Sequence, residues 1–245
     1  ASAAEADRLR QLLHELRTPI NAIQGFAEVI QQQVFGATPH QYRAMAASIA
    51  SDAAQMLAGF EEIERLVKLE SRVLELDPGE TDFGSVVARL IEQVSPVFAA
   101  RNVRLTVSLN VRDMIVNFAQ EEAERAVWRV LSVITASVAP GERLSIELAS
   151  GLAGASHMAS LSITLPAALQ KLDDTALFAP DATGSGAFTA SSMLGNGFAL
   201  RLARAEFMAG GGTLRREGPR LRIDLPCVTN GGYAATPAAP HTAAG

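Results

Sequence analysis

The chain has 245 residues, of which 48% are hydrophobic and 5% aromatic, and its formal net charge is −5. This length allows one large domain or two small ones, and the acidic balance lacks the basic footprint of a nucleic-acid-binding protein. No apolar run approaches the roughly 18 residues of a membrane span.

The single cysteine, Cys227, excludes an internal disulfide and fits a reducing compartment, so we expect a cytoplasmic protein. The chain does not begin with Met. An upstream sensor or membrane-anchoring part is therefore left open, and we expect contact with a membrane only through such a region.

Residues 1–72 are predicted to form two long helices, because apolar side chains recur in steps of three and four. The two seams consist of Leu9, Leu13, Leu16, Ile20, Ile23, Ala27, Ile30 and Val34, and of Tyr42, Ala46, Ile49, Ala53, Met56, Phe60, Ile63 and Val67. Between them, Thr38 can cap the second helix and Pro39 suits its first turn. A lone pair of helices cannot bury both seams fully, and dimerisation into a four-helix bundle would do so. On the pattern alone, a plain structural coiled-coil hairpin is the simpler alternative.

A histidine and a proline stand close together in the first helix. His14 and Thr18 are four residues apart and share a face outside the seam. Pro19 removes a backbone donor and crowds the carbonyl of Glu15, so the helix should bend just after the histidine. An exposed imidazole titrates near neutrality and can act as a nucleophile, although a solvated surface histidine without a role is the simpler alternative.

Residues 73–227 alternate between helical and strand patterns. Asp82 can cap a helix that continues to Phe98, and residues 121–138 read as another helix. Strand candidates are residues 103–109, 114–118, 143–149, 158–165, 213–217 and 220–226, with a helix at 198–209 between glycines. We therefore predict an α+β protein, in which the helical hairpin is followed by a two-layer α/β sandwich. Residues 228–245 read as a disordered tail.

The stretch His14-Glu15-Leu16-Arg17-Thr18-Pro19, with residues 20–28 after it, resembles the phosphoacceptor box of two-component sensor histidine kinases. The resemblance implies that His14 is phosphorylated on a ring nitrogen. It implies that Glu15 helps to take the proton, and that Thr18 helps to position water when the enzyme works as a phosphatase. In that family the proline allows the helix to flex. The exposed helix faces near His14 would dock a response regulator, with Arg17, Asn21 and Gln24 as candidate contacts.

The remaining chain is similar to the ATP-binding domain of that family, which belongs with the gyrase, Hsp90 and MutL type. The two asparagine positions of its metal-binding helix are occupied by Val133 and Ser137. A valine cannot ligate magnesium, and a serine offers one neutral oxygen where magnesium wants a near-octahedral set. Leu165 or Pro166 stands where the adenine-binding aspartate belongs, and Asp173 and Asp174 come too late in the chain to substitute for it.

Other parts of the ATP-binding pattern are retained. Gly195 and Gly197 match the glycine loop that opens a helix, while Ala199 replaces a third glycine. Such a loop can cradle phosphate through backbone amides, and its simpler interpretation is a tight turn before a packed helix. Phe178 resembles the phenylalanine of a further sequence box in that domain of the family. Residues 182–193 would form the lid over ATP, and they contain no Lys or Arg, so we expect a flexible segment that gives little electrostatic help.

These features predict a dimeric, histidine phosphotransferase-like member of the family, with a degenerate ATP-binding domain. Phosphoryl transfer or phosphatase action would run between His14 and the aspartate of a response-regulator receiver domain, and ATP-dependent autophosphorylation would be weak or lost. We expect no cofactor and no metal, with ATP and magnesium bound only if the divergent pocket is functional. An active ATP-dependent sensor kinase and a non-catalytic scaffold remain as alternatives.

Overall fold

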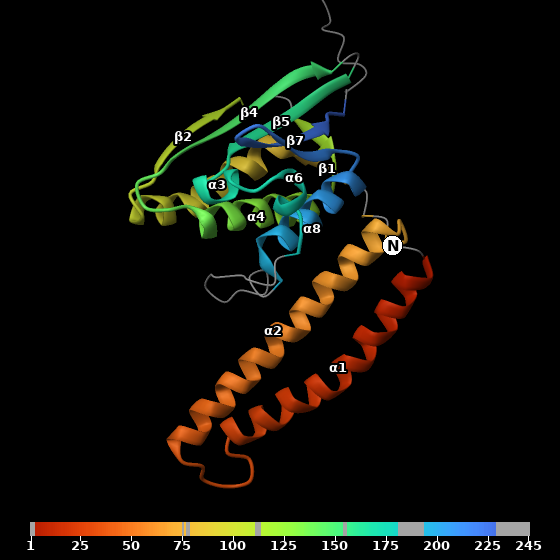
Figure 1. The fold of residues 1–245 in the computed structure, drawn as a ribbon, viewed down its shortest axis with the longest axis vertical. Helices are drawn as coiled ribbons and strands as arrows, with labels where there is room; N and C mark the ends of the chain where they lie inside the picture. Colours follow the sequence, from red (N-terminus) through yellow and green to blue (C-terminus); the bar gives the residue numbers. More distant parts are fainter. Residues whose placement is uncertain are drawn as a thin grey trace, which may run out of the picture.

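The computed structural model describes residues 3–74, 76, 79–110, 114–153, 156–180 and 194–228. Its first part is a hairpin of two long helices, α1 (Ala3–Gln31) and α2 (His40–Glu70). Its second part is a mixed α/β unit that extends along the chain from β1 (Glu80–Asp82) to β7 (Arg220–Pro226). The α+β class predicted from the sequence is therefore confirmed, and Figure 1 shows the hairpin extending away from the α/β unit.

The apolar seam of α1 divides into two stripes. Ala6, Leu13 and Ala27 are buried, and they lie at heptad or double-heptad spacing on one side of the helix. The neighbouring stripe is 36–49% exposed and consists of Leu9, Leu16, Ile23 and Ile30. On α2, Ala46 and Ala53 are buried while Tyr42 and Ile49 are exposed. Each helix therefore buries half of its seam in the hairpin and leaves the other half free.

The start of α2 differs from the prediction in one detail. The N-cap of α2 is Pro39 and makes no side-chain hydrogen bond, so the prediction that Thr38 caps this helix is wrong. The hydroxyl of Thr38 donates instead to the carbonyl of Gly36. Pro19 lies inside α1, which continues to Gln31 and is drawn in Figure 1 as one curved helix.

The α/β unit is built on a five-stranded sheet with the order β2-β4-β5-β7-β6. Its strands are β2 (Arg104–Leu109), β4 (Arg143–Ala153), β5 (Ser156–Thr164), β6 (Thr213–Glu217) and β7. Only the β2–β4 pair is parallel among the pairs of this sheet. Two further strands, β1 and β3 (Ile115–Asn117), pair separately, and the bridge between Val116 and Cys227 joins them to the end of β7.

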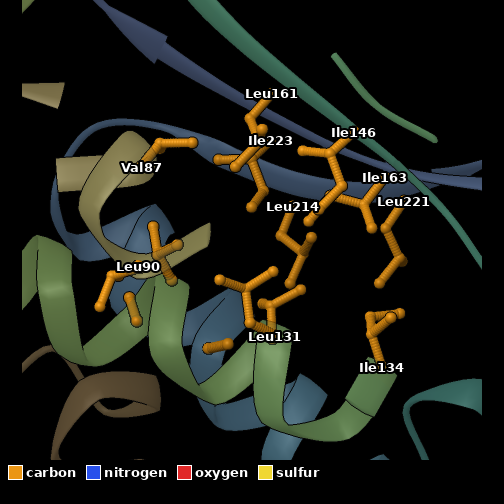
Figure 2. Close-up of a cluster of buried hydrophobic side chains, with 14 of the residues drawn as sticks. Val87, Leu90, Leu131, Ile134, Ile146, Leu161, Ile163, Leu214, Leu221 and Ile223 are labelled. Carbon is orange, nitrogen blue, oxygen red and sulfur yellow. The ribbon is translucent and has the colours of Figure 1, made fainter. Parts of the chain in front are cut away.

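Three helices cover one face of the sheet: α3 (Phe83–Ala100), α4 (Gln120–Ser137) and α8 (Gly195–Ala209). Figure 2 shows the core between these layers, where Ile146, Ile163 and Ile223 of the sheet meet Leu131 and Ile134 of α4. All five side chains are at most 1% exposed. This burial removes most apolar surface of the unit from water and holds the two layers together.

Most predicted elements are confirmed within a few residues. Asp82 caps α3 by accepting hydrogen bonds from the amides of Gly84 and Ser85. The sequence did not predict β1 or the short helices α5 (Ala167–Gln170) and α6 (Asp174–Leu177). The predicted lid at 182–193 and the tail beyond residue 228 lie outside the described residues.

An ion-pair cluster joins α2 to the α/β unit. It consists of Glu62, Arg65, Glu122, Arg129 and Glu206. Arg65 pairs with Glu122 and, at 2.7 Å, with Glu206. Arg129 pairs with Glu62 at 2.5 Å and with Glu206 at 3.4 Å. Burial alone would lower the pKa of Arg129, but Glu206 and Glu62 together raise it above its usual value. Beside the cluster, Leu66 and Leu69 of α2 pack with Phe198 and Leu202 of α8.

Candidate functional site

His14 lies on α1 with its side chain exposed to solvent. Thr18 and Asn21 follow at steps of four and three, and both are exposed on the same face. Within the described part of the chain, the ring of His14 makes no hydrogen bond or ion pair. The imidazole is therefore open to a reaction partner from solvent.

The carboxylate of Glu15 lies in the same turn and is also exposed. Gln11 donates a hydrogen bond of 3.1 Å to its Oε1, one turn earlier on the helix. Gln24 and Glu28 form a similar pair at 3.0 Å. The side chain of Gln24 is therefore partly occupied within the helix, whereas the second oxygen of Glu15 is available to accept a proton.

Arg17 faces α2 rather than the surface that His14 occupies. Its Nη2 donates to Glu64 Oε2 at 2.7 Å, and Lys68 Nζ lies 2.5 Å from the other oxygen of Glu64. The bond from Lys68 and the bond from Arg17 hold the pKa of Glu64 below its usual value against the opposing effect of burial. This bridge, which sequence reasoning did not find, fixes the turn after His14 against the second helix.

The positions of the family's metal-binding asparagines lie at the end of α4. Val133 is 3% exposed and belongs to the core of the α/β unit. The hydroxyl of Ser137 accepts a hydrogen bond of 3.1 Å from Nδ2 of Asn196, at the start of α8. Sequence reasoning considered the glycines on either side of Asn196 and missed this residue. Its side chain connects the end of α4 to the start of α8.

The two residues predicted to stand at the position of the family's adenine-binding aspartate, Leu165 and Pro166, are apolar and buried. Leu165 is 0% exposed, its side chain is part of the core, and its amide donates to the carbonyl of Pro219. Pro166 is the N-cap of α5. Asp173 caps α6 through the amide of Ala176, and Asp174 lies near Arg216 at the surface. Both aspartates therefore have local partners in the structure.

The glycine loop at the start of α8 is tightly packed. Gly195 has a φ of +82°, which favours glycine over residues with a side chain. A Cβ on Gly197 would lie 1.8 Å from the carbonyl oxygen of Ala179. The lack of a side chain at Gly197 is thus explained by the close approach of another part of the backbone.

Among the residues that the structure describes, no cluster of three or more His, Cys, Asp or Glu side chains is arranged to hold a metal ion. The same residues include no helix that is both long and apolar enough to cross a bilayer.

Comparison with known proteins places the exposed histidine in a defined domain. Residues 4–72 match the family model of the His Kinase A (phospho-acceptor) domain. The helical hairpin is therefore a His Kinase A (phospho-acceptor) domain, and the similarity to histidine kinases supports a place in the two-component sensor histidine kinase family. The match contains both helices of the hairpin and the whole phosphoacceptor box.

Three curated proteins are similar to parts of the chain. The Non-motile and phage-resistance protein of Caulobacter vibrioides is 35% identical over 77 residues, which are 31% of this chain and 9% of that protein. Histidine protein kinase DivJ of the same organism is 32% identical over 81 residues, or 33% and 14% of the two chains. Cell-division control histidine kinase PdhS of Brucella anthropi is 24% identical over 149 residues, or 60% and 14%. The chain thus spans only a small fraction of each relative.

Two solved structures, one of them that of a histidine kinase, share the fold. Full-length ShkA in complex with AMPPNP has a TM-score of 0.58 at 15% identity, and the match covers 90% of this chain and 45% of that one. Histidine kinase AdeS of Acinetobacter baumannii has a TM-score of 0.52 at 18% identity, with coverages of 88% and 98%. Both matches extend across the hairpin and the α/β unit, so the family's two-part architecture is present here.

Proposed function

We propose that this chain exchanges phosphoryl groups between His14 and the aspartate of a response-regulator receiver domain, or assists hydrolysis of that aspartyl phosphate. The exposed imidazole of His14 supports this proposal, because nothing in the described residues covers it or binds it. Glu15 and Thr18 lie within one turn of it and are exposed as well. The surface around His14, including Asn21, is then the surface that the receiver domain contacts.

In the transfer reaction, a ring nitrogen of His14 attacks the phosphorus of the receiver's aspartyl phosphate. A P–N bond forms while the P–O bond to the aspartate breaks, and the aspartate leaves as a carboxylate. Glu15 takes the proton that the imidazole gives up. In the hydrolytic reaction, Thr18 and Glu15 orient a water molecule that attacks the same phosphorus, and inorganic phosphate and the aspartate carboxylate are released.

We further propose that ATP does not serve as the phosphoryl donor. The observation that carries this is Leu165, an apolar core side chain at the position of the adenine-binding carboxylate. At the metal-binding positions, Val133 is buried and Ser137 is bonded to Asn196. The residues at these three positions do not fit a magnesium nucleotide, since they offer neither an acceptor for the adenine amino group nor a set of oxygens for magnesium.

A further part of the proposal is that the chain acts as a homodimer. The stripe of exposed apolar side chains on α1, from Leu9 to Ile30, supports it. A second copy would cover this stripe and complete a four-helix bundle.

The test offers the chain two donors. We expect no acid-labile label on the chain from radioactive ATP with magnesium. A receiver domain that was first phosphorylated with radioactive acetyl phosphate should either transfer its label to the chain or lose the label faster when the chain is present. The label on this chain should disappear in His14→Ala and persist in His40→Ala, which removes an exposed histidine from α2.

Two results would favour the alternatives. Label from ATP that depends on His14 would identify an active kinase, for which the retained glycines Gly195 and Gly197 are the supporting feature. A chain that neither accepts phosphoryl groups nor speeds their loss, and that binds the receiver equally well after His14→Ala, would be a scaffold.

A further inference from the structure

A cavity of about 890 Å³ lies between the hairpin and the α/β unit. Its walls come from the end of α2, from the segment that follows, and from α6 and α8. This volume falls in the range of small-molecule sites, which often form where two structural units meet. None of the residues discussed as phosphoacceptor or ATP-binding positions lines it except Phe178.

The lining combines apolar walls with an excess of positive charge. Leu74, Leu76 and Met208 contribute apolar surface. Three arginines contribute guanidinium groups, whereas Glu70 is the one carboxylate among the lining residues that the structure describes. Because Glu70 forms a two-bond pair with Arg201, at 2.6 and 2.8 Å, it neutralises one arginine and leaves two.

The two remaining arginines are Arg72 and Arg204. Neither has a carboxylate partner among the described residues. The guanidinium of Arg204 lies over the ring of Phe178, with 5.2 Å between its Cζ and the ring centroid. The geometry therefore places an aromatic face and two available cations around the same space, all of them reachable from solvent.

The backbone of Arg72 is held in an unusual conformation. Its φ is +54°, in the left-handed region that favours glycine or asparagine at the end of a helix. The amides of Val73 and Leu74 both donate to the carbonyl of Lys68, which closes the end of α2 around this residue. An arginine in this conformation costs stability that glycine would not.

We propose that this cavity binds a small organic anion that carries an aromatic ring. Arg72 and Arg204 bind the anionic group, a phosphate, sulfonate or carboxylate, while the ring packs on Phe178 and the apolar walls. Because both structural units contribute walls, the bound ligand stabilises their docked arrangement. This inference does not depend on phosphoryl transfer by His14, and neither result decides the other.

The experiment titrates the full chain with 1-anilinonaphthalene-8-sulfonate, a fluorescent aromatic anion. We expect saturable binding to one site. The variant Arg72→Gly should raise Kd at least about tenfold, which corresponds to one lost charge-assisted hydrogen bond. Its melting temperature should stay the same or increase, because glycine suits the backbone of residue 72. This combination separates a lost ligand contact from a damaged fold.

Three comparisons complete the design. Arg204→Ala should weaken binding like Arg72→Gly, whereas Arg104→Ala, at an exposed arginine of β2, should not. N-Phenyl-1-naphthylamine, which lacks the sulfonate, should bind the wild-type chain at least about tenfold more weakly. Any one of three results would overturn the proposal. Wild type and Arg72→Gly could bind the anionic dye with equal affinity, or Arg104→Ala could weaken binding as much as Arg72→Gly does. The third such result is that the wild-type chain binds the uncharged dye as tightly as the anionic one.

Discussion

At the scale of single residues, Gly197 shows how closely α8 packs against the rest of the chain. We expect Gly197→Ala to lower the free energy of unfolding by about 3 kcal/mol, because the new methyl group would have to displace the backbone of Ala179. Urea denaturation followed by circular dichroism measures this change. Gly25→Ala is the control: it lies in α1 with nothing within 4 Å of a Cβ, so it should add about 0.5–1 kcal/mol. Similar small effects of both changes would contradict the packing argument.

Thr18 and Glu15 have separable roles in the proposed chemistry. Thr18→Ala should slow hydrolysis of the receiver's aspartyl phosphate about tenfold or more while leaving transfer to His14 intact, because the hydroxyl only positions water. Glu15→Gln should slow both reactions, by about a hundredfold, since the amide accepts no proton. Single-turnover assays with a labelled receiver domain measure both rates. Equal effects of Thr18→Ala on the two reactions would contradict the assignment of Thr18 to water.

At the scale of secondary-structure elements, Glu64 connects α1 to α2 through Arg17. Its pKa is lower in the folded protein than in the unfolded chain, so the bridge stabilises the fold above the unfolded pKa of about 4.3. This stabilisation is lost as the pH falls through the lower, folded pKa. At neutral pH, Glu64→Gln should therefore reduce stability by up to about 1 kcal/mol. The difference from wild type should begin to shrink as the pH falls below about 4.3 and should vanish once the pH is below the folded pKa, as denaturant titrations at several pH values would reveal.

The ion-pair cluster between α2, α4 and α8 is a stronger connection, because Glu206 is 0% exposed. Removal of its charge leaves Arg65 and Arg129 short of a partner in a buried site. We expect Glu206→Gln to destabilise the protein by about 3–5 kcal/mol in thermal or chemical unfolding. Glu124→Gln, which affects a more exposed pair with Arg89, should change stability by less than about 1 kcal/mol. A loss of the same small size in Glu206→Gln would mean that the cluster contributes little.

The sequence predicted these elements better than it predicted their connections. Heptad spacing and strand alternation were sufficient for the long helices and for the five strands of the main sheet, because burial of one face imposes a period on the chain. The cluster around Glu206 joins residues far apart in the sequence, and no local period signals it. The bond from Asn196 to Ser137 was missed for the same reason. The short strand β1 escaped detection because its three residues, Glu80–Asp82, are all polar and show no apolar alternation.

At the scale of the whole molecule, the exposed stripe of α1 determines the predicted assembly. Ile23 is 44% exposed in the single chain and would be buried between two copies. Ile23→Asp should convert the dimer to a monomer in light scattering at micromolar concentration, because it places an unpaired charge in an apolar interface. Val97→Asp makes a similar change at a 39% exposed position on α3 and should leave the dimer intact. A wild-type chain that is already monomeric would contradict the prediction.

The burial of Leu165 also determines what an engineered nucleotide site would cost. Leu165→Asp would place a carboxylate in the core, at a cost of several kcal/mol. A typical domain has only about 5–15 kcal/mol of stability in total, so most of its margin would be lost before nucleotide binding could restore any of it. Val133 would still lack a metal-binding group after that first step. An aspartate introduced at residue 165 alone would therefore destabilise the fold without completing a nucleotide site.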